Sequence, residues 1–297
     1  MSISFKINSK DKFARSGVLK TAHGEVNTPV FMPVGTYGAV KGINPKDLSN
    51  LGSEIILSNT YHLMERPGKD IMASLGGLRS FMGWDGPILT DSGGFQVMSL
   101  QNMAKIDNDG VTFKSHLDGS LIRLTPKDSI DMQKALDSTI TMAFDECTSY
   151  PATHDVASKS MELSMQWAKV CRKEFVDRDG YGLFGIVQGS TFNDLRNISS
   201  EALINIGFDG YAIGGLAVGE GHDEMIKTLK SSINFLPEKS PRYLMGVGYP
   251  LDIIESVRSG VDMFDCVIPT RSGRTGKVFT KRGALNIKNA RHKNDPR

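Results

Sequence analysis

Short apolar runs alternate with helix-like segments along most of the 297-residue chain. The runs are rich in β-branched and aliphatic residues and are bounded by Gly, Pro or polar residues, as buried parallel strands are. We count eight runs, which read PVFMPVG, EIILSNT, GPILTDSG, STITMAFDE, YGLFGIVQG, DGYAIGGLAVG, PRYLMGVG and VDMFDCVIP. Eight strands alternating with helices predict a (β/α)8 TIM barrel of the α/β class, drawn as a single domain over residues 1–297. An open doubly wound sheet is the alternative, and the lack of a G-x-G-x-x-G motif after the first run disfavours it.

Three segments between the runs carry clear helix signals. Residues 154–176 place one face on the three-four rhythm of a helix, with Ala157, Met161, Ser164, Ala168, Cys171 and Phe175 on it. The next segment has candidate caps at Ser190 or Thr191 and a glycine stop at Gly207. The third has Pro250 near its start and Gly260 at its end.

Residues 101–126 interrupt the alternation of strands and helices after the third run. Turn-forming residues occur at 108–110 and at 118–119. The stretch predicts a hairpin-like insertion in the barrel.

Composition limits the class of protein. No apolar run approaches the ~20 residues of a membrane span, and the N-terminus has no signal-like apolar stretch. Three cysteines, Cys147, Cys171 and Cys266, are far apart and form neither a disulfide framework nor a C-x-x-C metal motif. We therefore expect a soluble protein of the reducing cytoplasm.

The charge is distributed unevenly along the chain. Residues 271–297 hold nine of the 35 Lys and Arg residues but only one of the 33 Asp and Glu residues. A basic end on a slightly acidic body favours a phosphate-rich partner, and a solvated tail is the equally compatible alternative.

Polar residues and glycines follow the apolar runs, at the positions where the strands of a barrel would end. The carboxyl ends of barrel strands carry the chemistry, because the loops that follow them converge there. From the second run to the eighth, these residues are Ser58, Asn59, Thr60, Asp91, Ser92, Gln96, Asp145, Glu146, Gln188, Gly214, Gly215, Gly246, Gly248 and Asp265.

The carboxylates Asp91, Asp145 and Asp265 are the strongest of these signals. A carboxylate at the end of an apolar strand is partly desolvated, so it must be paired, hydrogen-bonded or shifted in pKa. Any one of them could instead cap the next helix, but residues 266–268 continue an extended pattern and argue against that role for Asp265. Two facing carboxylates suit chemistry at a glycosidic carbon, in which one attacks and the other transfers a proton.

At these residues the sequence resembles the bacterial tRNA-guanine transglycosylase (queuine tRNA-ribosyltransferase) family. The matching stretches are FMPVGTYGAVKG, ILTDSGGFQVMSL, FDECTSYPA, FGIVQGS, GFDGYAIGGLAVGE, YLMGVGYP and MFDCVIPTRSGR, in register from about Phe13 to the end. The resemblance implies a (β/α)8 barrel with a small zinc subdomain. It also implies a transferase of queuosine biosynthesis that exchanges the wobble guanine of certain tRNAs for a 7-deazaguanine base.

The resemblance assigns roles to matching positions. It makes Asp265 the nucleophile at C1′ of the wobble ribose and Asp91 the general acid/base. Asp145, Gln188 and the N–H of Gly215 would read the base, between Phe95 and Met245. The implied base-binding set is Asp91, Ser92, Gly93, Gly94, Phe95, Asp145, Gln188, Gly215, Leu216 and Met245. The implied contacts to the anticodon loop are Gly246, Val247, Gly248, Tyr249, Pro250, Leu251, Asp252, Thr270, Arg271, Ser272, Gly273 and Arg274.

Two departures from the family pattern accompany this resemblance. Many members have Arg-Asn-Ala-Arg-Asn-Gly where this chain reads RSGRTG, but both arginines are kept. The family's structural zinc is held by three Cys and a His, whereas residues 277–297 contain no Cys and His292 alone cannot build a tetrahedral site. The zinc ligands would thus lie beyond Arg297, through truncation or a naturally short variant, and we assign no metal ligand in this chain. The resemblance further implies a homodimer.

Three other functions compete with this interpretation. They are the archaeal relative that modifies another tRNA position, a non-catalytic tRNA-binding partner subunit, and a retaining glycosidase. Retention of both Asp91 and Asp265 disfavours the second. The incoming base is expected to be 7-aminomethyl-7-deazaguanine, because Val218 stands where family members that accept the bulkier queuine tend to have glycine. The Leu216 carbonyl would accept from the aminomethyl group, and Glu220 would support the loop.

Overall fold

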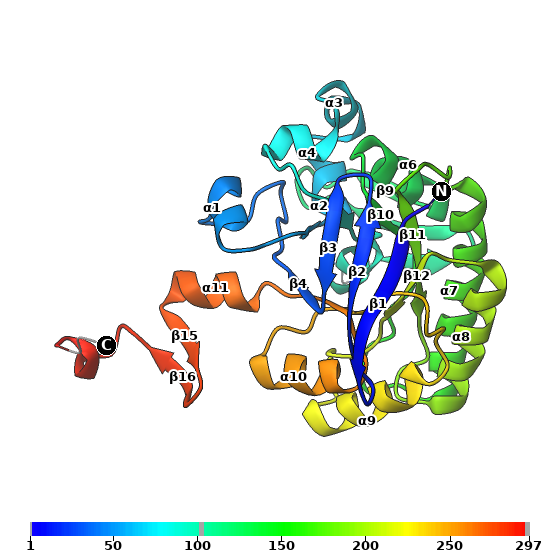
Figure 1. Cartoon of the computed structure of the whole chain (residues 1–297). Helices are drawn as coiled ribbons and strands as arrows, with labels where there is room; N and C mark the ends of the chain where they lie inside the picture. Colours follow the sequence, from blue (N-terminus) through cyan, green and yellow to red (C-terminus); the bar gives the residue numbers. More distant parts are fainter. Residues whose placement is uncertain (1, 101–103, 295–297) are drawn as a thin grey trace.

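The computed structural model describes residues 2–100 and 104–294, and its centre is a parallel eight-stranded barrel (Figure 1). Each apolar run supplies one strand, so the prediction of a (β/α)8 barrel is confirmed. Neighbouring strands follow the order β4-β14-β13-β12-β11-β10-β6-β5. A parallel bridge between Val34 and Leu57 joins the two ends of the sheet and closes it. The strands are β4 (Val30–Met32), β5 (Ile56–Ser58), β6 (Ile88–Thr90), β10 (Ile140–Met142), β11 (Gly182–Val187), β12 (Gly210–Ile213), β13 (Arg242–Leu244) and β14 (Met263–Asp265).

Side chains alternate between the inside of the barrel and the layer under the helices. On β14, Met263 belongs to the inner apolar cluster and Phe264 to the cluster shared with the helices. Because successive side chains of a strand point to opposite faces, Asp265 points inward like Met263. On β6, Leu89 lies in the inner cluster, and the same rule turns Asp91 toward the barrel axis.

Helices surround the barrel and connect its strands (Figure 1). They are α1 (Pro45–Asn50), α2 (Thr60–Glu65), α3 (Lys69–Ser74), α4 (Gly77–Met82), α5 (Gly94–Leu100), α6 (Pro126–Ala135), α7 (His154–Glu174), α8 (Asn193–Ile206), α9 (His222–Ile233), α10 (Pro250–Arg258) and α11 (Ile268–Thr275), with a 3-10 turn at Ala290–His292. A search of the described helices for a membrane span finds none with the necessary length and apolarity.

The three predicted helices are present, with one error at a helix start. The predicted face of α7 is buried, and α8 stops at Gly207, whose φ of 89° suits glycine. Pro250 opens α10, and Gly260 follows its C-cap residue. The prediction that Ser190 or Thr191 caps α8 was wrong. Its N-cap is Phe192, because Ser190 adopts a φ of 49° in the preceding turn.

The insertion after the third barrel strand is a three-stranded antiparallel sheet, one strand more than a hairpin. Its strands are β7 (Lys105–Asp107), β8 (Gly110–Lys114) and β9 (Leu121–Leu124). Both predicted turns fall between these strands. The first residues of the predicted stretch, 101–103, lie outside the described residues.

A second antiparallel sheet, not predicted, covers the amino-terminal end of the barrel. It contains β1 (Ser4–Asp11), β2 (Ala14–Thr21) and β3 (Gly24–Thr28). Leu19 and Val26 from this sheet join the inner cluster. Arg15 donates a 2.8 Å hydrogen bond to Asp262, just before β14. This end of the barrel is therefore filled and covered.

The polypeptide after the last barrel strand differs from its predicted form. Residues 266–268 were expected to be extended, but Val267 caps α11, which begins at Ile268 with Pro269 in its first turn. Proline fits this position because the first turn of a helix does not need its N–H. A short hairpin of β15 (Lys277–Thr280) and β16 (Gly283–Asn286) follows and lies away from the barrel (Figure 1).

Candidate active site

A cavity of about 390 Å³ opens at the carboxyl ends of the barrel strands. Residues at or just beyond all eight strand ends line it, as expected of loops that converge at one end of a barrel. The lining residues are Val34, Thr36, Leu57, Asn59, His62, Asp91, Ser92, Phe95, Gln96, Asp145, Cys147, Gln188, Gly214, Gly215, Leu216, Ala217, Val218, Tyr243, Met245, Gly246, Asp265, Cys266 and Val267.

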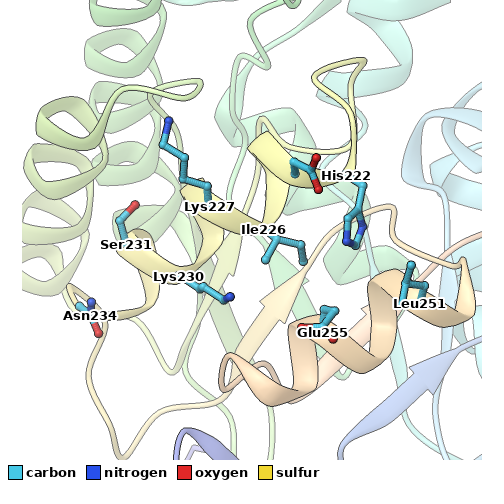
Figure 2. Close-up of a pocket in the computed structure, with 9 residues that line it drawn as sticks. His222, Ile226, Lys227, Lys230, Ser231, Asn234, Leu251 and Glu255 are labelled. Atoms are coloured by element: carbon cyan, nitrogen blue, oxygen red, sulfur yellow. The ribbon is translucent and has the colours of Figure 1, made fainter.

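A larger and more open hollow, of about 690 Å³, lies on the outside of the barrel between α9 and α10 (Figure 2). Its charged residues are mixed in sign. Lys227 pairs with Glu224 on α9, and Glu255 pairs with Arg258 on α10. None of the carboxylates at the strand ends lines this hollow. The smaller cavity is therefore the candidate active site.

Asp265 is held by one donor from the neighbouring strand β13 and one from the loop that follows it. The Tyr243 hydroxyl and the Gly246 N–H both donate to Oδ1, at 2.5 Å and 2.8 Å. Burial raises the pKa of Asp265 above the usual carboxyl range, and these two hydrogen bonds oppose the rise. Because both donors engage Oδ1, the other oxygen is left for a reacting group.

Asp91 is buried at the end of β6 and is bound to the start of α2. Asn59 Nδ2 donates to Oδ2 at 2.5 Å, and the Thr60 N–H donates to Oδ1 at 2.7 Å. Burial raises the pKa of Asp91 to about 6, against these hydrogen bonds, and the charge of Asp265 adds to the rise. A carboxyl with this pKa can exchange a proton near neutral pH.

Asp145 forms a separate polar set on the same cavity. Gln188 Nε2 donates to one of its oxygens at 2.7 Å, and the Ser92 hydroxyl donates to the other at 3.3 Å. Burial raises the pKa of Asp145 to about 6. Gln188 Oε1 is also buried, and it has no hydrogen-bond partner within the described part of the chain. A ligand with donors and acceptors along one edge would complete this set.

The floor of the cavity beside Gln188 requires glycine. A Cβ at Gly214 would stand 2.8 Å from Gln188 Nε2, and one at Gly215 would stand 2.7 Å from Gln188 Oε1. Gly215 also has a φ of 65°, which disfavours other residues. The backbone can therefore approach a ligand here without an intervening side chain.

Apolar side chains form the walls of the cavity. Phe95, 48% exposed, and the half-buried Met245 lie on it, together with the buried Leu216. The loop that carries Val218 is fixed by Glu220, which accepts from the N–H groups of Ala217 and Val218 at 2.5 Å and 2.9 Å.

Most of the residues predicted to bind the base share this cavity, but two do not line it. Gly93 has a φ of 83° and packs on the backbone of Tyr61, while the Gly94 N–H donates to the Ser92 hydroxyl at 3.3 Å. These two glycines shape the turn behind the lining.

Of the residues predicted to contact RNA, one lines the cavity and some others are inaccessible. Gly246 lines the cavity, and Tyr249, Arg271 and Arg274 are exposed. Val247 is buried in the core, so its side chain does not reach a partner. Pro250, Leu251 and Asp252 begin α10, and Thr270, Ser272 and Gly273 lie on α11.

Sequence reasoning missed several residues of the cavity. Tyr243 lies inside an apolar run, and no role was predicted for it. His62 lines the cavity from α2, and burial lowers its pKa. Asn59 was noted at a strand end but not as a partner of Asp91. Its position directly after an apolar run was the available signal.

The expected zinc has no ligand set in the described structure. Within residues 2–100 and 104–294, no group of three or more His, Cys, Asp or Glu is placed to hold a metal ion. The residues present do not fit the group, so we derive no step through a metal.

Fold and cavity together define a (β/α)8-barrel protein with the groups for chemistry at a glycosidic carbon. The family model described as "Queuine tRNA-ribosyltransferase" matches residues 10–297. A queuine tRNA-ribosyltransferase of Granulibacter bethesdensis is 59% identical over 297 residues, which is 100% of this chain and 78% of the relative. Proteins of the same name from Rickettsia bellii and Rickettsia felis are 57% and 56% identical over 292 residues, which is 98% of this chain and 81% of each relative. The chain belongs to the queuine tRNA-ribosyltransferase family.

Proposed function

We propose that the protein is a tRNA-guanine transglycosylase that exchanges guanine at the wobble position of tRNA for a 7-deazaguanine base, in queuosine biosynthesis. The observation that carries the proposal is the meeting of Asp91, Asp265 and the Asp145–Gln188 pair on one cavity. The first two suit chemistry at C1′ of a ribose, and the pair suits a planar base with a pairing edge. Family membership supports tRNA as the substrate.

The reaction is a double displacement at C1′ of the wobble ribose. Asp265 attacks with the oxygen that Tyr243 and Gly246 leave free, the C1′–N9 bond breaks, and guanine leaves with its bonding electron pair and takes the proton of Asp91, which becomes a carboxylate. After guanine has left, Asp91 removes the N9 proton of the incoming base. That nitrogen then attacks C1′ and releases Asp265. The pKa of Asp91, about 6, suits this proton transfer.

The base is read along its pairing edge. Asp145 accepts from N1–H and the 2-amino group, while Gln188 and the Gly215 N–H donate to the 6-oxo group. Gln188 Nε2 carries two hydrogens, so it can keep its 2.7 Å bond to Asp145 while the second hydrogen faces the base. Phe95 and Met245 hold the two faces of the ring, as expected for a base taken out of its stack.

The incoming base is 7-aminomethyl-7-deazaguanine and not queuine. Val218 lies half-buried on the cavity, and its loop is fixed by Glu220. A cyclopentenyl ring at that position would clash with the Val218 side chain, and the backbone carbonyl of Leu216 can accept from an aminomethyl group.

The anticodon loop lies against the exposed Arg271 and Arg274 and against residues 246–252. Lys277 lies over the rings of Tyr249 and Phe279, 5.7 Å and 5.3 Å from their centroids, so the basic hairpin β15–β16 adjoins this segment. Phosphate contacts of this kind supply sequence-independent affinity. A single-domain architecture, a homodimer, a structural zinc and a cytoplasmic location stay predictions drawn from the family or the composition.

The decisive experiment measures incorporation of radiolabelled guanine into unmodified tRNA. The protein should label tRNAs that have guanine at the wobble position and not those in which that guanine is replaced by adenine. Lack of label in every tRNA, with intact binding, would favour the non-catalytic partner subunit. Hydrolysis of a glycoside without base exchange would favour a glycosidase.

A further inference from the structure

Arg196 on α8 is a fully buried cation behind the base-binding floor, with a relative exposure of 0%. Its guanidinium donates to three backbone carbonyls, those of Ser190 at 2.7 Å, Gly214 at 2.8 Å and Val187 at 3.4 Å. Among the described residues, no carboxylate hydrogen-bonds to it. Burial lowers its pKa to about 10, so it keeps its charge at neutral pH.

The three carbonyls belong to the two strand ends that carry the base readers. Val187 ends β11 and precedes Gln188, while Gly214 follows β12 and precedes Gly215. Ser190 adopts a φ of 49° in the turn after Gln188 and points its carbonyl at Arg196 Nε. One side chain thus connects both halves of the floor.

The contact to Gly214 determines the direction of the next N–H. In a trans peptide the C=O and the following N–H point in opposite directions. Because the Gly214 carbonyl faces Arg196, the Gly215 N–H faces away from it. It donates toward Cys147, whose thiol lines the cavity. A charged donor on a carbonyl also polarises the peptide and strengthens its N–H as a donor.

We propose that Arg196 is a positioning residue for base recognition, which orients and polarises the Gly214–Gly215 peptide so that its N–H binds the 6-oxo oxygen of guanine. This inference rests on the proposed function. It extends that function by assigning a specificity role to a side chain that does not touch the base. A residue that only filled space would not need a buried charge, because burying one is unfavourable unless its donors are engaged.

The test compares guanine with 2-aminopurine, which lacks the 6-oxo oxygen and also the N1–H that Asp145 reads. The quantity that tests Arg196 is therefore the change in the ratio of the two affinities between the wild type and each variant. Binding of both bases is titrated in the wild type, Arg196→Gln and Arg196→Lys, with 2-aminopurine followed by its own fluorescence. Arg196→Gln should weaken the binding of guanine by about tenfold more than the binding of 2-aminopurine, because one good hydrogen bond contributes about this much to affinity. Arg196→Lys keeps the charge and should lose less of this discrimination.

Leu203→Ala is the matched control, since Leu203 is a buried apolar residue of the same helix. It should lower the unfolding temperature and change the affinities for both bases by the same factor. Equal losses for both bases in Arg196→Gln would overturn the inference, because a general disturbance of the fold acts on both. If neither substituted protein folds, Arg196 is a structural residue and the inference is also overturned.

Guanine exchange into tRNA by the wild type is measured alongside. Without exchange the proposed function fails. With exchange but unchanged base discrimination in the Arg196 variants, only the role of Arg196 fails.

Discussion

The Tyr243 hydroxyl donates a 2.5 Å hydrogen bond to Asp265 Oδ1 and so helps to keep the buried carboxylate ionised. The tyrosine stays a donor at working pH, since burial raises its own pKa well above the usual range. Removing the hydroxyl in Tyr243→Phe should raise the pKa of Asp265 further. The acid limb of the pH profile of kcat/KM should therefore move to higher pH, with activity recovered in alkaline buffer. A uniform loss at every pH would contradict this role.

Asp265→Asn should abolish the covalent tRNA adduct while the fold stays intact, because the amide is nearly isosteric but a poor nucleophile. The adduct is trapped on a denaturing gel with a base analogue that cannot be exchanged. Adduct at wild-type yield would show that another residue is the nucleophile.

Asp91→Asn should bind tRNA normally but slow base exchange by about 10²–10⁴-fold, the usual worth of a general acid/base. Single-turnover kinetics separate this effect from binding. Exchange at the wild-type rate would assign proton transfer to another group.

Asp145→Asn should stabilise the fold at neutral pH while it weakens base binding. The folded pKa of Asp145, about 6, lies above the ordinary aspartate value of 3.8. As pH rises from about 4 to 6 the unfolded chain loses its proton first, so this group lowers stability over that window. The neutral amide removes the cost of burying the ionised carboxylate. The free energy of unfolding should therefore rise by up to about 3 kcal/mol at pH 8 and should not change below pH 4. Urea unfolding at the two pH values measures it.

Asp107→Asn should change the free energy of unfolding in the opposite direction when it is measured in the same experiment. Asp107 is exposed, and its hydrogen bond from Arg123 lowers its pKa to about 2. This carboxylate contributes stability above its unfolded pKa and loses it as pH falls. The substitution should therefore lower stability at pH 8 and have no effect below pH 2. A gain at pH 8 in both variants would indicate that net charge, and not the site, is responsible.

Val218→Gly should admit queuine. In the wild type, kcat/KM should be much higher for 7-aminomethyl-7-deazaguanine than for queuine, because the larger ring meets the valine side chain. The glycine variant should narrow this ratio by at least about tenfold, since a clash with a whole ring exceeds the ~1–3 kcal/mol of one methylene. Equal efficiency for the two bases in the wild type would contradict the assignment of the substrate.

Arg271→Ala and Arg274→Ala should each weaken tRNA binding and reduce the slope of log K against log salt by about 1, the mark of one lost phosphate contact. Affinity for free guanine should not change. Arg274 also donates to the Lys41 carbonyl at 3.1 Å, so its variant is compared with Arg271→Ala by thermal unfolding. An unchanged salt slope in both would remove α11 from the RNA interface.

The barrel could be predicted from sequence because its strands are buried on both faces and therefore read as continuous apolar runs. The amino-terminal sheet was not predicted because its outer strands β1 and β3 are largely exposed and lack a continuous apolar run. The middle strand β2 alternates buried and half-buried residues, and of its buried residues only Leu19 is a large apolar one. The extended conformation predicted for residues 266–268 was wrong for a related reason. Apolar residues before a proline resemble a strand, whereas here the proline occupies the first turn of α11.

The carboxylates of the site could be found because strand ends of a barrel converge, whichever helices follow. Their partners could not be found in the same way. Tyr243 is indistinguishable in sequence from a core aromatic, and the contact that matters comes from the neighbouring strand. Arg196 belongs to an amphipathic helix, where a charged residue is expected to face water. Its burial depends on two strand ends that only the folded barrel brings together.

The sheet β1–β3 fills and covers one end of the barrel, and this has a kinetic consequence. A cavity that is blind at its inner end has a single mouth, which the ribose of the bound tRNA itself occupies. The departing and arriving bases cannot bind at the same time on opposite sides of C1′. They must therefore occupy the same binding site one after the other. Double-reciprocal plots of initial rate against tRNA concentration, measured at several fixed concentrations of the incoming base, should therefore be parallel lines, because guanine has to leave before its replacement can enter.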